Sequence, residues 1–548
     1  MESPVLQSLT LGQILDNTIS KYPDNDAVVY YDRDFRLTYR EFGELVDRLA
    51  KGLMALGIQK GEKVAVWATN VPYWVALQFA TAKIGSILVT VNTLYKIAEV
   101  SYLLEQSDCE NLFIIDGFRD TDYVQTIYDL VPELKTHERG YLKSEKFPHL
   151  KRVFFLGHEK HRGMYSIFEV MALASMTSDK EYQDRQALLD PQDVVNMQYT
   201  SGTTGFPKGV MLTHHNIGNN GYWIGANQVL GPNDRICLTV PLFHCFGCVL
   251  GVLAAINHGS ALVILESFDP VMAMASVEAE RCTALYGVPT MFIAMLQHKL
   301  FNKFDFSSLR TGIMAGSPCP VVTMNEVIEK MYAREITICY GLTEGSPVLT
   351  QTTVNDSIRQ KTETVGKAMP EIEVCLMDPE TRKPTPTGAQ GEVCCRGYNV
   401  MKGYYKMPEA TAEAVDAEGW LHSGDLGVLD EDGYLAITGR YKDMIIRGGE
   451  NIYPREVEEY IFKMEGIQDV QVVGVASGKY GEQVGAFVVL KDGYSYTPDD
   501  IRDYCRGKIS SYKVPKYVVF IDKYPLTASG KVQKYKLRQQ ANELFPDA

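Results

Sequence analysis

One short stretch of the chain gathers hydroxyls, glycines and a lysine in the pattern of a phosphate-binding loop. It reads Tyr-Thr-Ser-Gly-Thr-Thr-Gly-Phe-Pro-Lys-Gly over residues 199–209. Glycine lets backbone N–H groups turn toward a phosphate, hydroxyls donate further hydrogen bonds, and lysine supplies positive charge. A Walker A loop ends in Gly-Lys-Ser or Gly-Lys-Thr, whereas Lys208 lies between Pro207 and Gly209. The stretch therefore predicts a nucleoside triphosphate site that is not a P-loop.

Four further segments combine aromatic, acidic and basic residues with glycine, and they follow this loop along the chain. The first reads Tyr-Gly-Leu-Thr-Glu at 340–344, and the second reads Trp-Leu-His-Ser-Gly-Asp at 420–425. The third runs through 439–454, and the fourth reads Leu-Thr-Ala-Ser-Gly-Lys at 526–531. By residue type and by order, the five segments resemble the signatures of the adenylate-forming superfamily, which comprises acyl-CoA synthetases, luciferases and adenylation domains.

Within that superfamily, the chain is most similar to medium-chain fatty acyl-CoA synthetases, through the run over 442–456 and the pairing of 507–510 with Lys531. The resemblance implies that ATP transfers AMP to a carboxylic acid, that pyrophosphate leaves, and that a thiol then displaces AMP. The first step brings a carboxylate against a polyanion, so cations must offset the repulsion. The implied ligands are a small-molecule carboxylic acid, expected to be a medium-chain fatty acid, together with ATP, Mg²⁺ and coenzyme A.

The resemblance also gives roles to individual polar residues. Lys531 is expected to bridge the attacking carboxylate and the α-phosphate, and Glu344 to hold Mg²⁺, a hard cation that prefers oxygen ligands. Tyr340 offers a flat face to adenine, Thr343 a hydroxyl to the α-phosphate, and Asp425 a carboxylate to both ribose hydroxyls. The other residues expected to contact ATP or AMP are Thr200, Ser201, Gly202, Thr203, Thr204, Gly205, Lys208, Gly316, Ser317, Gly341 and Arg440. The residues expected to act in catalysis are Lys208, His244, Thr343, Glu344 and Lys531.

The acid is expected to bind beside the segment Pro-Leu-Phe-His-Cys-Phe-Gly at 241–247, which resembles the acyl-side motif of the family. In that motif the histidine, here His244, borders the carboxylate pocket. A single histidine among apolar residues can equally be packed in a core, and that alternative stays open. The residues expected to line the acyl pocket are Phe243, His244, Phe246, Tyr286, Gly287, Met291 and Gly316.

The second half-reaction requires space for a thiol where pyrophosphate has left. The resemblance implies that the C-terminal domain rotates about a hinge at Lys442, which exchanges Lys531 for a loop that receives coenzyme A. The residues expected to contact coenzyme A are Arg447, Gly448, Gly449 and Glu450. Between Arg502 and Arg538, ten basic residues are accompanied by only two acidic ones. This cationic segment could meet the phosphates of coenzyme A or be an ordinary solvated face.

The pattern of elements predicts an α/β fold. Helical and strand patterns alternate through most of the chain, with buried strands expected at 63–68, 261–265 and 311–315. We expect a large N-terminal domain over 1–439, made of two α/β subdomains and a small β region over about 371–439. A mobile α+β C-terminal domain is expected over 440–548, with strands at 470–475 and 484–490.

Composition limits the class of protein. A chain of 548 residues is too long for one core, and its formal net charge of −14 argues against a nucleic-acid partner. Eleven scattered cysteines indicate neither a disulfide framework nor a zinc site. No stretch is apolar and long enough to cross a bilayer, and we expect a cytoplasmic monomer or homodimer.

Three other functions stay open. An aryl-acid CoA ligase would differ only in the acyl pocket, and a fatty acyl-AMP ligase that loads a carrier protein would share the nucleotide residues. A non-catalytic nucleotide-binding protein would have lost catalytic groups. Against this last alternative, the chain keeps Lys208, Glu344, Asp425, Arg440 and Lys531.

Overall fold

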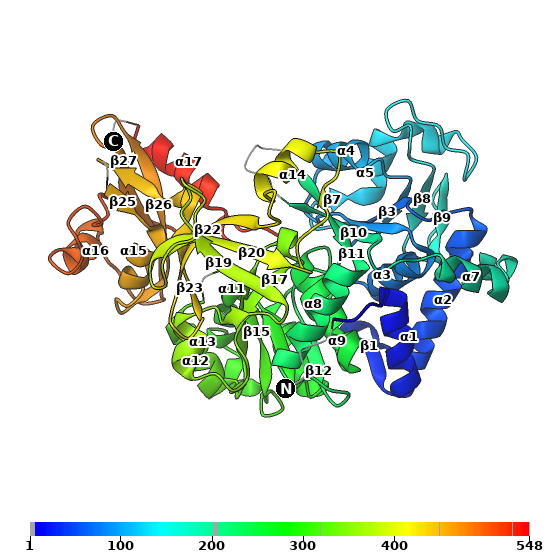
Figure 1. The fold of residues 1–548 in the computed structure, drawn as a ribbon, viewed down its shortest axis with the longest axis horizontal. Helices are drawn as coiled ribbons and strands as arrows, with labels where there is room; N and C mark the ends of the chain where they lie inside the picture. Colours follow the sequence, from blue (N-terminus) through cyan, green and yellow to red (C-terminus); the bar gives the residue numbers. More distant parts are fainter. Residues whose placement is uncertain (1–5, 201–206, 318, 449, 529, 547–548) are drawn as a thin grey trace. The chain divides into compact units, whose positions relative to one another are not determined.

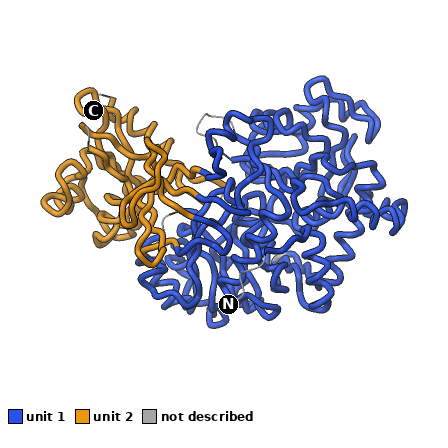
Figure 2. Tube along the Cα trace, in the orientation of Figure 1, with its two compact units in different colours: residues 1–362, 366–373, 395–421 blue, residues 363–365, 374–394, 422–548 orange. Residues whose placement is uncertain are grey.

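The computed structural model describes residues 6–200, 207–317, 319–448, 450–528 and 530–546. The chain forms two compact units (Figure 2). Unit 1 comprises residues 1–362, 366–373 and 395–421, and unit 2 comprises 363–365, 374–394 and 422–548. The expected domain boundary between residues 439 and 440 lies inside unit 2, and the hinge at Lys442 stays a prediction.

The first large sheet of unit 1 is mostly parallel, and most of its short strands are buried. Its strands β1, β12, β15 and β17 are labelled in Figure 1. Its order is β18-β17-β16-β15-β14-β12-β13-β1-β2, and the pairing is parallel from β16 to β1. The strands are β1 (Asp26–Tyr30), β2 (Phe35–Thr38), β12 (Arg235–Leu238), β13 (Ala261–Ile264), β14 (Ala284–Gly287), β15 (Thr311–Ala315), β16 (Thr337–Gly341), β17 (Val348–Gln351) and β18 (Lys367–Ala368). The strands expected at 261–265 and 311–315 are confirmed as β13 and β15. Because parallel strands end at the same edge, the loops after β12, β14, β15 and β16 leave the sheet together.

The second large sheet of unit 1 has the order β21-β11-β10-β4-β3-β5-β8-β9. Its strands are β3 (Lys63–Trp67), β4 (Ile87–Thr90), β5 (Asn111–Ile114), β8 (Arg152–Phe155), β9 (Met164–Ser166), β10 (Val194–Thr200), β11 (Lys208–Thr213) and β21 (Gly403–Tyr404), and a separate hairpin pairs β6 (Gly117–Phe118) with β7 (Thr121–Asp122). The strand expected at 63–68 is confirmed as β3. Strands β11 and β21 run antiparallel to their neighbours at one end of the sheet.

The helices of unit 1 pack against these sheets, and α2 shows how the sequence sets one of them. Thr38 and Glu41 form a capping box, since each side chain accepts a hydrogen bond from the other's backbone N–H. Gly57 has a φ of 81° directly after the end of the helix, where a left-handed residue is needed. The helices are α1 (Leu11–Lys21), α2 (Tyr39–Ala55), α3 (Pro72–Ile84), α4 (Ile97–Gln106), α5 (Tyr123–Leu130), α6 (Ile167–Ala172), α7 (Asp179–Ala187), α8 (His214–Asn227), α9 (Ala254–His258), α10 (Pro270–Ala279), α11 (Pro289–Leu296), α12 (Val321–Lys330), α13 (Ile358–Glu363) and α14 (Pro408–Ala414).

Most of the small β region belongs to unit 2, together with the C-terminal elements. The small sheet has the order β19-β20-β22-β23, formed by β19 (Ile372–Met377), β20 (Gln390–Gly397), β22 (Leu421–Leu429) and β23 (Leu435–Arg440). The C-terminal sheet has the order β25-β24-β27-β26 with β28 beside β27, formed by β24 (Ile445–Arg447), β25 (Glu450–Ile452), β26 (Ile467–Ser477), β27 (Gly481–Leu490) and β28 (Tyr517–Phe520). Helices α15 (Pro454–Ile461), α16 (Pro498–Cys505) and α17 (Lys534–Leu544) complete this α+β region. The strands expected at 470–475 and 484–490 lie within β26 and β27.

Among the described residues, no helix combines the length with the apolar composition that a membrane-spanning segment needs.

Candidate active site

The predicted phosphate-binding loop connects two adjacent antiparallel strands. Thr200, at the end of β10, lies directly opposite Lys208, at the start of β11. The hairpin therefore fixes both ends of the loop. Five of the predicted phosphate ligands lie outside the described residues: Ser201, Gly202, Thr203, Thr204 and Gly205.

A tyrosine that the sequence analysis did not single out joins Lys208 to the predicted magnesium ligand. The Lys208 Nζ lies 4.8 Å from the centre of the Tyr404 ring, and the Tyr404 hydroxyl donates a 2.7 Å hydrogen bond to Glu344 Oε1. Strand β21 brings Tyr404 there, because it adds to the phosphate-loop hairpin and places Tyr404 opposite Val210. Burial, and next the Glu344 carboxylate, raise the pKa of Tyr404. The phenol therefore stays protonated and remains a donor to the carboxylate.

The backbone around Glu344 is held from two sides. Thr343, Glu344 and Gly345 form a short 3₁₀ turn after β16. The Met401 N–H donates to the Glu344 carbonyl over 2.9 Å, and Asn399 Nδ2 donates to the Gly345 carbonyl over 3.1 Å. A carboxylate held in this way beside a buried phenol has the oxygen chemistry that Mg²⁺ prefers.

The acyl-side motif lies next to this turn. The Cys245 Sγ lies 3.7 Å from the Thr343 hydroxyl and 3.6 Å from His244 Nδ1. The Phe246 N–H donates to His244 Nδ1 over 3.1 Å, which makes Nδ1 the acceptor and leaves the proton of the neutral ring on Nε2. Two of the predicted catalytic residues, His244 and Thr343, therefore flank one cysteine, although the sequence separates them by about a hundred residues.

The remaining predicted acyl and adenine residues lie at the carboxyl edge of the first sheet. Tyr286 and Gly287 end β14, Gly316 and Ser317 follow β15, and Tyr340 and Gly341 end β16. The Phe246 and Tyr286 rings have centres 6.4 Å apart, with Phe243 and Met291 also buried. A Cβ at Gly287 would come within 3.2 Å of the Phe292 ring, so any larger residue there would crowd this group. The edge is where ligands bind in open α/β sheets, and the acyl-pocket roles stay predictions.

In unit 2, the predicted ribose ligand is paired with Arg440. The Arg440 Nε donates to Asp425 Oδ1 over 2.8 Å, and the two residues lie opposite each other on β22 and β23. The Asp425 side chain is 12% exposed, whereas that of Arg440 is 59% exposed. The guanidinium thus lies at the surface while it orients a mostly buried carboxylate.

The predicted coenzyme A loop is a hairpin of the C-terminal sheet. Arg447 ends β24, donates from Nε to Gln483 Oε1 over 2.7 Å and lies 4.8 Å from the centre of the Tyr480 ring. The Gly448 N–H donates to the Tyr480 carbonyl over 2.8 Å, with φ of 60° at the glycine. Glu450 is exposed at the start of β25, and Gly449 lies outside the described residues. Predicted hinge residue Lys442 is exposed in the 3₁₀ turn Tyr441–Asp443.

Tyr480 itself was not predicted from the sequence. The pKa of Tyr480 is lowered by a hydrogen bond with Lys479, by the charge of Lys479 and, to a smaller extent, by the charge of Arg447. The ring is 36% exposed, so an exposed aromatic face lies among cations beside Gly448. The run Gly-Lys-Tyr-Gly at 478–481 was the available signal, and it reads as an ordinary turn.

Lys531 is held in a closed turn. Its backbone N–H donates to Thr527 Oγ1 over 3.0 Å, and the Thr527 N–H donates to the Lys531 carbonyl over 2.7 Å. Gly530 takes a φ of 82° within that turn, and Ser529 lies outside the described residues. The backbone of Lys531 is therefore held by Thr527 of unit 2.

In the fold, carboxylates offset part of the positive charge of the cationic segment over 502–538. Several of its cations form ion pairs with carboxylates, most of which come from elsewhere in unit 2. The pairs are Arg502–Asp499, Arg506–Asp503, Lys513–Glu456, Lys534–Glu458 and Arg538–Glu482. These pairings favour the alternative of a solvated, internally balanced face.

Comparisons with known proteins identify the family of the chain. The chain matches the family described as AMP-binding enzyme over residues 15–405 and the AMP-binding enzyme C-terminal domain over residues 456–531. It is 54% identical over 536 residues to YngI of Bacillus subtilis (strain 168), named as an acyl-CoA synthetase, with 98% of each chain covered. It is 41% identical over 546 residues to the mitochondrial medium-chain acyl-CoA ligase ACSF2 of Danio rerio, covering 99% of this chain and 90% of that protein.

A solved structure of another protein has the same fold as this chain. ATP-bound MatB from Rhodopseudomonas palustris superposes with a TM-score of 0.83 at 26% identity, covering 98% of this chain and 100% of that chain. The predicted α/β class with a large N-terminal and a smaller C-terminal part is therefore confirmed, and so is the resemblance to adenylate-forming enzymes. The chain belongs to the AMP-binding enzyme family.

Proposed function

We propose that the chain is an ATP-dependent acyl-CoA synthetase whose substrate is a medium-chain fatty acid. The observation that carries the proposal is the contact series Lys208–Tyr404–Glu344, which couples the phosphate-loop hairpin to the turn that bears Thr343. The identity to medium-chain ACSF2 supports the substrate class. None of the eleven cysteines, all of which lie in the described part of the chain, forms a disulfide bond, and a reducing cytoplasm is the proposed location.

In the first half-reaction, the acid attacks the α-phosphorus of ATP, and pyrophosphate leaves. Lys208 and Lys531 supply positive charge against the phosphates, and the Thr343 hydroxyl donates to the α-phosphate. Glu344 would hold Mg²⁺, which offsets charge on the phosphates when bound. Tyr404 keeps the Glu344 carboxylate oriented, because it donates to Oε1 from a ring packed under Lys208. Asp425 binds the ribose hydroxyls and is oriented by Arg440.

In the second half-reaction, the thiol of coenzyme A attacks the acyl carbonyl and AMP leaves. The hairpin of Arg447 and Gly448 is the proposed entry for the pantetheine chain, because a glycine there leaves room for a thin substrate. Lys442 is the proposed hinge that exchanges this hairpin for Lys531. The two half-reactions then need different residues of unit 2.

The proposal is tested by measuring AMP release from purified protein with ATP and Mg²⁺, with and without coenzyme A. Short, medium and long saturated fatty acids are compared with benzoate-type acids. We expect AMP release to require coenzyme A and to peak with medium chains, where one methylene changes binding by about 1–3 kcal/mol. Turnover of aromatic acids alone would favour the aryl-acid ligase. Acyl-AMP formation with no transfer to coenzyme A would favour the carrier-loading enzyme, and no AMP with any acid would favour a non-catalytic protein.

The same preparation tests the proposed monomer or homodimer. Size-exclusion chromatography with light scattering gives the mass of the particle directly. A mass near 61.4 kDa or twice that value is expected.

A further inference from the structure

A mostly buried carboxylate of the small sheet holds the strand that carries Asp425. The Glu392 side chain, on β20, is 14% exposed and contacts two residues of β22. Its Oε1 accepts from the Gly424 N–H over 2.9 Å, and its Oε2 accepts from His422 Nδ1 over 2.9 Å. The Glu392 carboxylate therefore accepts hydrogen bonds from the Gly424 backbone and from the His422 side chain, both within three residues of Asp425.

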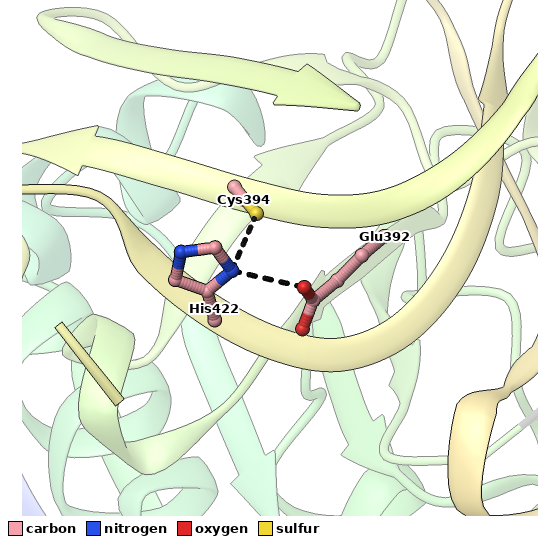
Figure 3. A group of neighbouring side chains, drawn as sticks. All are labelled: Glu392, Cys394 and His422. Carbon is pink, nitrogen blue, oxygen red and sulfur yellow. Dashed lines mark hydrogen bonds and ion pairs between the residues drawn. The ribbon is translucent and has the colours of Figure 1, made fainter. Parts of the chain in front are cut away.

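The group also contains Cys394. The distances among Glu392, Cys394 and His422 decide whether the group is a hydrogen-bonded cluster or a metal site. Cys394 Sγ lies 3.4 Å from His422 Nδ1, the nitrogen that also faces Glu392 (Figure 3). Ligands of a tetrahedral zinc at about 2.0–2.3 Å would lie roughly 3.3–3.8 Å apart, farther than the 2.9 Å between Nδ1 and Oε2. In a catalytic Cys–His–Glu triad, one ring nitrogen of the histidine faces the cysteine and the other faces the carboxylate. Here Cys394 and Glu392 both contact Nδ1 of His422. The cluster is therefore a hydrogen-bonded support.

The support acts at a point where the strand leaves regular geometry. Gly424 has a φ of 73°, a left-handed conformation that glycine adopts readily but that glycine alone does not enforce. The next residue, Asp425, donates from its N–H to Ser423 Oγ over 3.1 Å and accepts from Arg440 over 2.8 Å. The register of β22 on β23 also shifts directly after Asp425, between Leu426 and Gly427. The Glu392–Gly424 hydrogen bond therefore fixes the turn that aims the Asp425 carboxylate.

We propose that Glu392 is a positioning residue for recognition of the nucleotide ribose, acting through Gly424 on Asp425. The inference rests on the proposed role of Asp425 as the ligand of the ribose hydroxyls. Replacing Glu392 by Ala removes the acceptor of two N–H groups in a mostly buried place. Hydrogen bonds to a charged acceptor are the strong ones, and losing them loosens the Asp425 turn.

The experiment compares ATP with 3′-deoxy-ATP in the acyl-AMP half-reaction. We expect the wild type to prefer ATP in kcat/KM, and Asp425→Asn to lose most of that preference. Glu392→Ala should lower the preference about tenfold, mainly through the KM for ATP. Glu392→Gln should keep more of it, because the amide oxygen can still accept from the Gly424 N–H. The double variant Glu392→Ala with Asp425→Asn should be no less selective than Asp425→Asn alone, because both act on one contact.

The matched control is Glu373→Gln on the neighbouring strand β19. Glu373 is 62% exposed and pairs with Arg396 at the surface, so the preference for ATP should stay unchanged. If Glu392→Ala does not fold, as thermal unfolding would show, Glu392→Asp and Glu392→Gln provide the same comparison. Variants of Glu392 that lose thermal stability but keep the wild-type preference would overturn the inference. If Asp425→Asn itself keeps the preference, the ribose role of Asp425 fails, which is a separate result.

Discussion

The hydroxyl of Tyr404 donates a 2.7 Å hydrogen bond to the carboxylate of Glu344, and the two residues are separated by 60 positions in the chain. The bond joins the edge strand of one sheet to the turn that follows β16 of the other. Both sheets belong to unit 1, and the bond lies where the phosphate-loop hairpin meets the predicted magnesium ligand. The predicted site thus contains an aromatic residue between its lysine and its carboxylate.

Tyr404→Phe should therefore slow acyl-AMP formation while the fold persists. The ring remains under Lys208, but Glu344 loses a charge-assisted hydrogen bond, and we expect kcat/KM for ATP to fall about tenfold. Pyrophosphate release at several Mg²⁺ concentrations measures the effect. The control is Tyr405→Phe, whose hydroxyl donates to Asp108 over 2.8 Å. Equal losses in the two variants would contradict a specific role for Tyr404.

Lys531→Ala should abolish one half-reaction and spare the other. Removing a cation aimed at developing charge costs about a hundredfold or more in rate, so acyl-AMP formation should nearly stop. Thioester formation from supplied acyl-AMP and coenzyme A should continue at close to the wild-type rate. Lys536→Ala, an exposed lysine on α17, is the control. Parallel loss of both half-reactions in Lys531→Ala would exclude the proposed exchange about Lys442.

Gly448→Val should have the opposite effect. A Cβ at Gly448 would lie 3.3 Å from the Tyr480 ring, and the residue would keep a φ of 60°, which a β-branched side chain resists. We expect acyl-AMP to accumulate while its transfer to coenzyme A slows. Gly493→Val imposes a similar strain at a φ of 85° with open space around the Cβ. Slowed transfer in both variants would show a general effect of strain in unit 2.

His214 should make the stability of unit 1 sensitive to acid. Burial lowers the pKa of His214 from 6.5 to about 4, and Nδ1 accepts from the Leu11 N–H over 3.1 Å. The unfolded chain therefore binds the proton more readily, so the contribution is complete above pH 6.5 and is lost as the pH falls toward 4. For the wild type, this group alone should lower the free energy of unfolding by about 2 kcal/mol between roughly pH 7.5 and pH 5.

Urea unfolding at both pH values tests whether acidification lowers the free energy of unfolding. His214→Asn keeps an acceptor for the Leu11 N–H and cannot gain a proton, so the variant should lose less stability on acidification. His149→Asn changes a histidine whose side chain is 57% exposed and should behave as the wild type does. An acid-induced loss in His214→Asn as large as in the wild type would contradict the assignment.

Helix ends and short strands could be predicted from the sequence, because the interactions that set them involve residues only a few positions apart. The Thr38–Glu41 capping box and the left-handed Gly57 delimit α2, as their types predict. The alternation of helix and strand patterns gave the α/β class, because buried parallel strands are short apolar runs. Strand β22 was not among the predicted strands, because glycine and polar residues interrupt its strand pattern.

The cationic segment shows where counting along the chain fails. Its ten basic residues have few acidic neighbours in sequence, yet Glu456, Glu458 and Glu482 reach them from other elements of unit 2. Net charge over a segment describes a surface only when no other segment packs against it.

The sequence by itself determined the reaction family, since the phosphate loop, Glu344, Asp425 and Lys531 lie in motifs that are contiguous in the chain. Only the tertiary structure decided which residues support them. Tyr404 reaches Glu344 through the pairing of β21 with β11, and Glu392 reaches Gly424 across the small sheet. The physical reason is that hydrogen bonds of a few ångströms depend on how distant strands align, and no short stretch of sequence specifies which distant strand it pairs with.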